Sequence, residues 1–313
     1  MVRISHIAAF AASLSAASAS CLSGTKLAAR AADGTVAVSK FNYTGAGGPL
    51  NWFSLNTSAN SACSKGKFQS PIDIVTQAIG YASTASLNFS VPAVTSAKFE
   101  NLGTNVEVVV NGTLVTSNLT YTLAQFHFHT PSEHRIDEEY FPLEAHFVFE
   151  SEGMSMSQRH HPASSWPNII HASTGSVFVL LLYTMLTDPA SDIAVVAFVF
   201  QLSQFGYSAP LFDSVFAHLD DIATPGTFTK TGPLDFAGLE KHFNDHGVYA
   251  YTGSLTTPPC SENVAWYIST EPVPLNVQTY NAVKKVVKFN ARYTQNTLGL
   301  DNLLELSAAA LQH

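Results

Sequence analysis

The chain has 313 residues, of which 46% are hydrophobic and 12% are charged, and its formal net charge is −8. This apolar content excludes general disorder, and a negative chain without a Lys/Arg-rich block is a poor candidate for binding nucleic acid. No stretch approaches the roughly 20 apolar residues that a membrane-spanning helix needs.

The N-terminus has the pattern of a secretion signal. Arg3 supplies a positive start, the run Ile4–Ala12 is apolar, and Ala17-Ser18-Ala19 is a small-residue cleavage pattern. We therefore expect residues 1–19 to be the signal peptide of a secreted, extracellular protein. Residues 20–40 are rich in Ala, Ser and Gly and are predicted to form a flexible leader.

Short strand-like runs dominate the rest of the chain. They are rich in Val, Phe, Tyr and Thr and are separated by Gly, Pro and Asn, as strands are. The predicted strands are Asn105–Val110, Tyr121–Thr130, Leu143–Glu150, Val177–Thr184, Ile193–Leu202 and Ala265–Thr270, and the predicted helices are Pro210–Leu219 and Val277–Phe289. We expect a mainly β protein with a few short helices, in which one domain over residues 41–305 is built on a large, twisted, mostly antiparallel sheet. A tail is expected over residues 306–313.

Two further features agree with export. Five Asn-x-Ser/Thr sequons are candidates for glycosylation. They begin at Asn42, Asn56, Asn88, Asn111 and Asn118. The chain also has three cysteines, Cys21, Cys63 and Cys260, so one disulfide formed in an oxidising compartment would leave one thiol over.

The strongest local pattern is Gln125-Phe126-His127-Phe128-His129. Alternate residues of a strand share one face, so Gln125, His127 and His129 are predicted to point the same way. The run Leu143–Val148 offers a third imidazole, with Glu144 and His146 again in phase. Gln125 and Glu144 each lie two residues before a histidine, which suits acceptors that orient the rings.

Three neutral imidazoles favour a catalytic zinc ion. They would leave the fourth tetrahedral position open, whereas structural zinc sites are closed and usually contain Cys. Zinc lowers the pKa of its bound water to about 7, so hydroxide is present at neutral pH. We therefore expect one Zn²⁺ per chain at His127, His129 and His146. For His127 and His129 alone, the alternative is a pair of ordinary strand histidines.

Several segments together resemble the alpha-class carbonic anhydrases. Gln125–His129, Ser132-Glu133-His134 and Glu144-Ala145-His146 are similar to the zinc-binding core of that family. Tyr251–Cys260 resembles its substrate-pocket segment, with Trp266 following at the expected interval. Further matches lie at Tyr43, Gly48-Pro49, Trp52, Gln69–Ile74 and Asn290-Ala291-Arg292, so the resemblance runs in family order from about residue 43 to 292.

The resemblance implies reversible hydration of CO₂ to bicarbonate and a proton, with weak esterase side activity and inhibition by sulfonamides. His127, His129 and His146 would bind the zinc ion, and Gln125 and Glu144 would be the hydrogen-bond partners of His127 and His146.

The family match also implies how hydroxide and CO₂ are held. Thr256 would accept a hydrogen bond from zinc-bound hydroxide and donate its own proton to Glu133. An apolar CO₂ pocket with one polar side would be lined by Val148, Val195, Leu255, Trp266 and, on the polar side, Thr257.

The cysteines also have counterparts in the family. Cys63 and Cys260 occupy positions that are paired as a disulfide in exported members, and this bridge would brace the loop that carries Thr256. Cys21 would remain near the mature N-terminus, unpaired or linking two chains. The expected assembly is a monomer or a homodimer.

Two places depart from the family pattern. Many members carry a proton-shuttle histidine in a segment that resembles Glu100–Asn105, and here Thr104 occupies that place. A threonine hydroxyl does not take up a proton near neutral pH, so we expect slower proton release, carried by buffer or another residue. Tyr43 resembles the family tyrosine that orders water, and we expect it to keep part of that solvent network. The polar segment Ser151–Gly175 is longer than the usual connection and predicts a surface loop.

Two other classes of function fit parts of the pattern. A cupin-like metal protein would use His127-x-His129-x-x-x-Glu133 with Glu133 as a ligand, but Tyr140 stands where a glycine is expected. A catalytically silent binding protein would keep the fold and lose a zinc ligand, yet all three histidines are present. The predicted function is therefore that of a carbonate dehydratase, a lyase, with CO₂ and bicarbonate as its partners.

Overall fold

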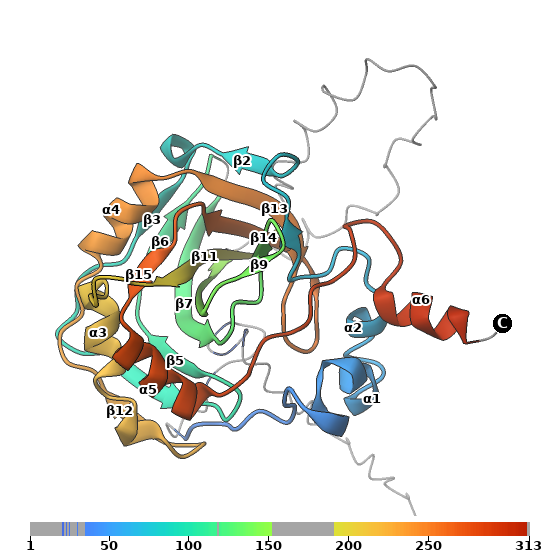
Figure 1. The fold of residues 1–313 in the computed structure, drawn as a ribbon, viewed down its shortest axis with the longest axis horizontal. Coiled ribbons are helices and arrows are strands. Elements are labelled where there is room, and N and C mark those ends of the chain that lie inside the picture. Colours follow the sequence, from blue (N-terminus) through green and yellow to red (C-terminus); the bar gives the residue numbers. More distant parts are fainter. Residues whose placement is uncertain are drawn as a thin grey trace, which may run out of the picture.

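The computed structural model describes Cys21, Ser23, Thr25, Arg30 and residues 35–117, 119–151 and 191–311. Figure 1 shows a large twisted sheet with short helices around it. Several predictions lie outside the described residues: the signal peptide, the strand Val177–Thr184, the sequon at Asn118 and nearly all of the loop Ser151–Gly175.

The strands form one large and one small sheet. The large sheet contains β2 (Gly80–Ala82), β3 (Asn88–Ser90), β4 (Lys98–Asn101), β5 (Val106–Val109), β6 (Thr113–Val115), β7 (Thr120–His129), β10 (Leu143–Ser151), β11 (Ile193–Leu202), β12 (Phe228–Lys230), β13 (Val248–Ser254), β14 (Glu262–Ser269) and β15 (Val273–Leu275). The small sheet contains β1 (Asp73–Ile74), β8 (Arg135–Ile136) and β9 (Glu139–Tyr140).

The order of the strands places β7, β10 and β11 in the middle. The path runs β12-β4-β5-β7-β10-β11-β14-β13-β2, with β15 beside β11 and β6 between β3 and β7. Neighbouring strands of the large sheet are antiparallel except where β11 meets β14 and β15. The prediction of a mainly β protein on a mostly antiparallel sheet is confirmed. The strand prediction Ile193–Leu202 matches β11 at both ends.

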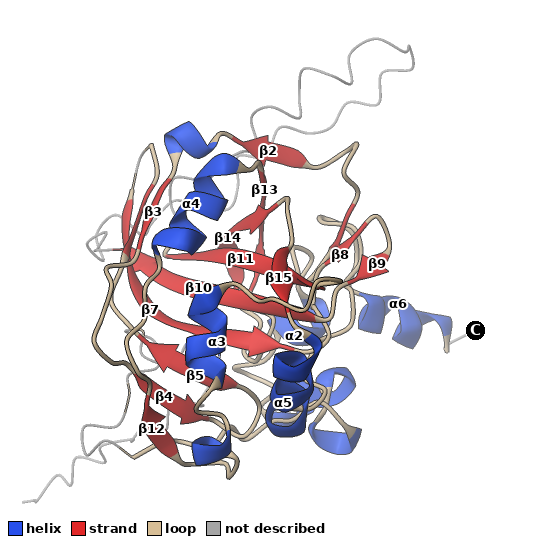
Figure 2. Cartoon of the chain, turned by 60° about the vertical axis from the view of Figure 1, so that its left-hand side comes forward, coloured by secondary structure: helices blue, strands red, loops and turns tan. Residues whose placement is uncertain are grey.

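The longer helices lie against the sheet. The helices are α1 (Trp52–Leu55), α2 (Ala62–Lys65), α3 (Pro210–Phe216), α4 (Ala237–Asp245), α5 (Val277–Val287) and α6 (Leu303–Ala310), with 3-10 turns η2 (Gly45–Gly47), η3 (Pro49–Asn51), η4 (Thr84–Ser86) and η7 (Asp220–Ile222). Figure 2 shows α3, α4 and α5 on one side of the sheet. No helix in the described ranges has both the length and the apolar content to cross a membrane.

Local sequence explains where these helices begin. Pro210 stands in the first turn of α3, where its missing N–H costs nothing. Asn276 caps α5, because its side-chain oxygen accepts a hydrogen bond from the backbone N–H of Thr279 at 2.7 Å. Both helices were predicted. The helices α4 and α6 were not, and α6 runs across the predicted domain end at residue 305.

Alternation along β7 separates a packing face from a site face. Phe126 stacks on Phe147 with ring centroids 4.6 Å apart, and Phe128 lies 4.7 Å from Phe216 of α3. Burying one such side chain contributes about 1.5–3 kcal/mol. The residues that alternate with these phenylalanines along β7, including His127 and His129, must therefore face the opposite side of the sheet.

The predicted disulfide is present. Cys63 of α2 and Cys260 form a bond between residues 197 apart in the sequence, and both side chains are fully buried. The bridge ties α2 to the loop between β13 and β14, which carries Thr256 and Thr257.

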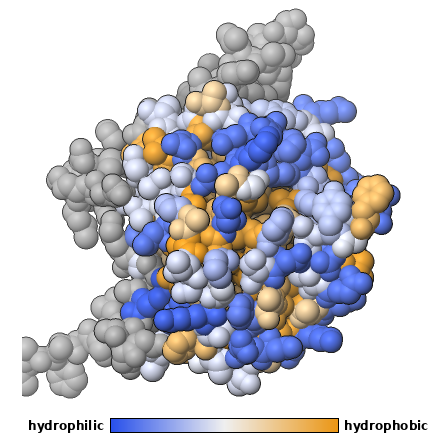
Figure 3. Space-filling view, turned by 90° about the vertical axis from the view of Figure 1, so that its left-hand side faces the viewer, coloured by the Kyte–Doolittle hydropathy of each residue, from blue (hydrophilic) through white to orange (hydrophobic). Residues whose placement is uncertain are grey.

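Hydrophilic side chains and the asparagines of the described sequons lie on the surface. Figure 3 shows the side of the molecule that carries α3 and α4, where hydrophilic side chains surround stretches of hydrophobic surface. The asparagines of the four described sequons, Asn42, Asn56, Asn88 and Asn111, are all exposed.

Candidate metal centre

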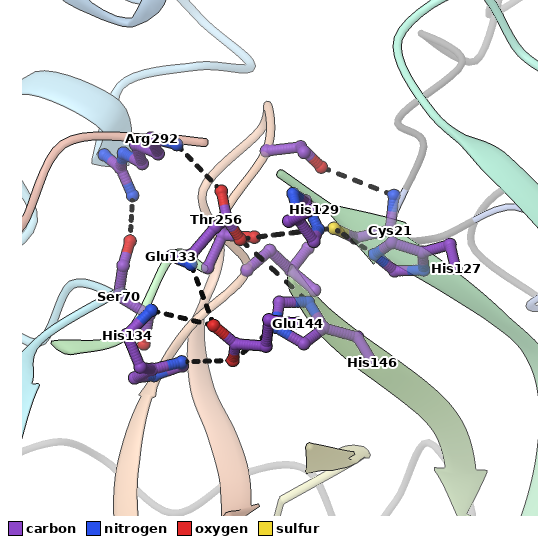
Figure 4. A network of polar contacts seen from close by, with 12 residues as sticks. Cys21, Ser70, His127, His129, Glu133, His134, Glu144, His146, Thr256 and Arg292 are labelled. Atoms are coloured by element: carbon purple, nitrogen blue, oxygen red, sulfur yellow. Dashed lines mark hydrogen bonds and ion pairs between the residues drawn. The ribbon is translucent and has the colours of Figure 1, made fainter. Parts of the chain in front are cut away.

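The register of β7 and β10 brings the predicted histidines together. His127 lies directly opposite His146 in the antiparallel pair, and His129 lies opposite Glu144. Opposed residues of neighbouring strands share one face, so the three imidazoles project from the same side of the sheet. All three rings are buried, and Figure 4 shows them grouped to the right of Thr256.

One nitrogen of each ring is held by an acceptor. Nδ1 of His127 lies 2.9 Å from the Gln125 side-chain oxygen, and Nε2 of His146 lies 2.8 Å from Glu144. Nδ1 of His129 lies 2.8 Å from the backbone carbonyl of Asn290. Such contacts fix the tautomer, because the anchored nitrogen carries the proton and the other nitrogen keeps its lone pair.

The remaining ring nitrogens fit a metal ion. Nε2 of His129 and Nδ1 of His146 are buried, and neither has a hydrogen-bond partner among the described residues. Potential ligand atoms of His129, His146 and Glu133 lie within 4.8 Å of one another, as do those of His127, His129 and Cys21. Buried polar atoms without partners are rare and costly, so a cation bound between these rings would satisfy them.

Burial keeps the histidines neutral. Burial, followed by the positive charge that His146 would carry, lowers the pKa of His129 to about 3. The pKa values of His127 and His146 are also lowered, with burial again the largest cause. Neutral imidazole is the form that binds a metal, so these rings need not lose a proton before binding one.

Glu144 connects the metal centre to His134, a histidine outside the three predicted ligands. Its Oε2 accepts hydrogen bonds from the backbone N–H groups of Glu133 and His134, both at 2.8 Å. Its Oε1 lies 2.7 Å from Nδ1 of His134 and 2.8 Å from Nε2 of His146. Burial alone would raise the pKa of Glu144, but the two facing histidines hold it well below its usual range. Glu144 is therefore a carboxylate that anchors His146.

This connection continues away from the centre. Nε2 of His134 lies 2.7 Å from the Tyr251 hydroxyl, which lies 2.8 Å from the Ser70 hydroxyl. The sequence pattern placed His134, Tyr251 and Ser70 in motifs without giving them a role. Their contacts join segments that are far apart in the sequence, so strand periodicity carried no signal for them.

Glu133 and Thr256 lie next to each other, as predicted from the resemblance. Burial raises the pKa of the Glu133 carboxyl well above its ordinary range, against the lowering effect of a hydrogen bond with Thr256. The backbone N–H of Arg292 donates to Glu133 Oε1 at 2.9 Å. Glu133 Oε2 lies 3.4 Å from His129 Nε2 and 4.0 Å from His146 Nδ1.

The predicted apolar wall is continuous. Val195 of β11 lies opposite Val148 of β10 and beside Trp266 of β14. These three side chains and Leu255 belong to one buried hydrophobic cluster. Thr257, two residues after Leu255, is fully buried and adds a hydroxyl.

The two predicted solvent-network residues have different partners. Tyr43 packs against Phe41 and Trp52, and its hydroxyl has no hydrogen-bond partner within the described ranges. The Thr104 hydroxyl donates to the Ser39 hydroxyl at 2.9 Å. Neither contact supplies a group that titrates near neutral pH.

Cys21 lies inside the site, which the sequence did not indicate. Its Sγ is 3.5 Å from Nε2 of His127 and 3.7 Å from the Thr256 hydroxyl (Figure 4). Its backbone N–H donates to the Thr257 hydroxyl at 3.4 Å, and its carbonyl accepts from the Gln125 amide at 3.4 Å. Burial, then the negative charge of Glu133, raises the pKa of this thiol to about 12. A buried thiol at this place is not available to a second chain.

Comparison with known proteins assigns the class. The family model for eukaryotic-type carbonic anhydrase matches residues 48–166 and 182–303, so the chain belongs to the alpha-class carbonic anhydrase family. A carbonic anhydrase from Pectobacterium atrosepticum is 31% identical over 252 residues, which cover 79% of this chain and 83% of that protein.

Solved structures agree with this class. The fungal alpha carbonic anhydrase from Aspergillus oryzae is 53% identical, with a TM-score of 0.72, and the match covers 86% of this chain and 98% of the other. The alpha-carbonic anhydrase from Photobacterium profundum is 26% identical, with a TM-score of 0.63, over 84% of this chain and 99% of the other.

Proposed function

We propose that this chain catalyses the reversible hydration of CO₂ to bicarbonate and a proton, using one zinc ion held by His127, His129 and His146. The observation that carries the proposal is the set of three buried imidazoles on one face of the sheet, each with one nitrogen anchored. The family assignment supports the same reaction.

The donor set suits zinc because neutral imidazole is one of its common ligands and three protein ligands leave a position for chemistry. Zinc bound there supplies a Lewis acid that makes water a nucleophile near neutral pH. Gln125 and Glu144 hold the rings of His127 and His146 in the orientation that binding requires.

The surrounding side chains divide the remaining work. The apolar wall of Val148, Val195, Leu255 and Trp266 accepts uncharged CO₂ and excludes bulk water from it. We assign to Thr256 the task of orienting the nucleophile, because its hydroxyl donates a hydrogen bond to Glu133 and offers a lone pair to the site. The same acceptor discriminates against anions that have no proton to donate.

Proton release is the step for which this chain lacks the family's shuttle histidine. Thr104, at the place of the family's shuttle histidine, contacts Ser39 and cannot act as a base near neutral pH. We therefore assign proton transfer to external buffer.

We further propose that the enzyme is secreted and glycosylated. The disulfide and the exposed positions of Asn42, Asn56, Asn88 and Asn111 support this, since both features belong to exported chains.

The direct test is stopped-flow CO₂ hydration by the purified protein before and after chelation, with metal content measured alongside. We expect one zinc ion per chain, activity that is lost on chelation, and recovery when zinc is returned. Zinc-loaded protein that is inactive both as the parent and with Cys21 replaced by Ser would favour the silent binding protein, and iron or manganese with a Glu133 ligand would favour the cupin-like alternative.

A further inference from the structure

Three residues before the catalytic domain make contacts at the metal centre and beside it. We call Cys21, Ser23 and Arg30 the N-terminal plug. Ser23 donates to Glu107 Oε1 at 2.9 Å. Arg30 lies 2.8 Å from the same oxygen through Nη2 and 3.2 Å from Glu100 through Nε. Together with the four polar contacts of Cys21, these bonds hold the plug to β4, β5, β7 and the loop between β13 and β14.

The position of the Cys21 sulfur fits that of a metal ligand. Zinc binds sulfur at about 2.3 Å and imidazole nitrogen at about 2.0–2.1 Å, so in a tetrahedral site the two ligand atoms lie about 3.5 Å apart. The observed separation between Sγ and His127 Nε2 is 3.5 Å. Sγ and potential ligand atoms of His127 and His129 all lie within 4.8 Å of one another.

A second observation points to the same ligand. Nε2 of His129 is buried and lacks a hydrogen-bond partner in the described parts of the chain, although the Cys21 thiol is near. An ion bound by both rings and by Sγ would satisfy this nitrogen. The Thr256 hydroxyl, which the proposed function directs at the nucleophile, lies 3.7 Å from Sγ. The Cys21 sulfur therefore lies where the proposed function needs the open fourth position of the zinc ion.

Charge also favours the plug. Glu107 is fully buried and Glu100 nearly so, and Arg30 is the cation that lies against both carboxyl groups. The Glu100 carboxylate loses hydration when it is buried, so the bonded guanidinium stabilises it more than the same pair would on the surface, while Glu107 accepts a hydrogen bond from Arg30. The anchors at Glu100 and Glu107 explain how a segment outside the domain is held in place.

We propose that Cys21 is a removable fourth zinc ligand, so that the plug keeps the enzyme latent until Cys21 leaves the site. This inference rests on the proposed zinc function. When Sγ binds the metal, the thiol proton passes to solvent and the sulfur fills the position that water would take. Displacement of the plug, by cleavage of the chain after it or by modification of the thiol, would open that position.

Cobalt substitution gives a readout that does not depend on activity. The full chain retains Cys21, as intact mass can verify, and Cys21 is its only thiol because Cys63 and Cys260 are bonded to each other. Cobalt-loaded protein should show a thiolate-to-cobalt charge-transfer band in the near ultraviolet. The band should be absent in Cys21→Ser and retained in Ser23→Ala, the matched control from the same plug.

Thiol chemistry and kinetics complete the test. A disulfide reagent should modify Cys21 at least about tenfold more slowly in zinc-loaded than in metal-free protein, since coordination blocks the nucleophile. Zinc-loaded Cys21→Ser should hydrate CO₂ at least about tenfold faster than the zinc-loaded parent, whose open position is occupied.

The outcomes separate the two proposals. If neither the parent nor Cys21→Ser binds zinc and hydrates CO₂, the proposed function is wrong. If both bind zinc and are equally active, and the parent shows no thiolate-to-cobalt band, only the role of Cys21 is wrong.

Discussion

Glu144 lies 2.8 Å from Nε2 of His146, and this contact decides which nitrogen of His146 faces the other two rings. The carboxylate accepts a hydrogen bond from the N–H group at Nε2, which leaves the lone pair on Nδ1 directed into the site. The same carboxylate is held by the backbone of Glu133 and His134, so it cannot follow the ring if the ring turns.

Replacing Glu144 with Gln should weaken zinc binding by about 10- to 100-fold, the usual cost of removing the partner of a metal-binding histidine. The amide is uncharged, and one of its two ends donates hydrogen bonds, whereas both oxygens of the carboxylate accept them. Competition with a zinc-binding dye measures the affinity. Glu139→Gln, an exposed carboxylate on β9, is the control and should leave it unchanged.

Removing the metal should lower the melting temperature. A ligand that binds only the folded state at a hundredfold excess over its Kd contributes about 2.7 kcal/mol. Differential scanning fluorimetry with and without chelator measures the shift. The melting temperature of His127→Ala, which lacks a proposed zinc ligand, should change little on chelation. An equal shift in this variant would mean that the chelator acts elsewhere.

Loss of the disulfide should destabilise the fold. Replacing both Cys63 and Cys260 with Ser should cost about 2–5 kcal/mol of the free energy of unfolding, measured by urea denaturation. The reference is Cys21→Ser, which keeps the bridge. A double variant as stable as this reference would show that the bridge does not brace the fold.

Stability should fall as pH rises through the titration of Glu107. Burial raises the pKa of this carboxyl to about 8 from an ordinary value of 4.5, with Arg30 opposing the rise and Glu100 adding to it. The folded chain therefore holds a proton that the unfolded chain has lost between these pH values, so folding becomes less favourable across that window. Melting temperatures across this range should decline less steeply in Glu107→Gln than in the parent.

Glu271→Gln supplies the control for this pH series, because Glu271 is exposed and should keep the slope of the parent. A Glu107→Gln profile that matches the parent at every pH would show that Glu107 is ionised in the folded protein.

A histidine at position 104 should speed proton release. In the Cys21→Ser background, with the site open, Thr104→His should raise CO₂ hydration in weak buffer and change it little in strong buffer. Stopped-flow rates across a buffer series measure the effect. Equal turnover in weak and strong buffer, unchanged by the substitution, would contradict the proposed dependence on buffer.

The parts of the site that could be predicted from the sequence are those encoded by strand alternation and by family motifs. His127, Gln125, His146 and Glu144 lie in phase on two strands, and the structure pairs each ring with the expected acceptor. The disulfide was also predicted correctly, from the resemblance to exported family members.

The contacts that escaped prediction depend on long-range chain crossings. The acceptor for His129 is a backbone carbonyl at Asn290, and every residue carries a carbonyl, so no residue type marks it. Cys21 and Arg30 precede the domain in a stretch whose composition indicated a loose leader. Only the folded sheet reveals that the buried carboxyl groups of Glu100 and Glu107 lie within reach of Arg30.

The alternation of β7 has a consequence for how this enzyme tolerates change. Phe128 touches Phe216 on one side of the strand, while its neighbours His127 and His129 hold their places on the other. A substitution in the residues that pack against α3 could shift β7 by a fraction of an ångström. Such a shift would weaken zinc binding although no residue near the ion has changed. Genetic screens for loss of activity should therefore recover substitutions in the phenylalanine-packed face of the sheet as often as substitutions in the metal centre.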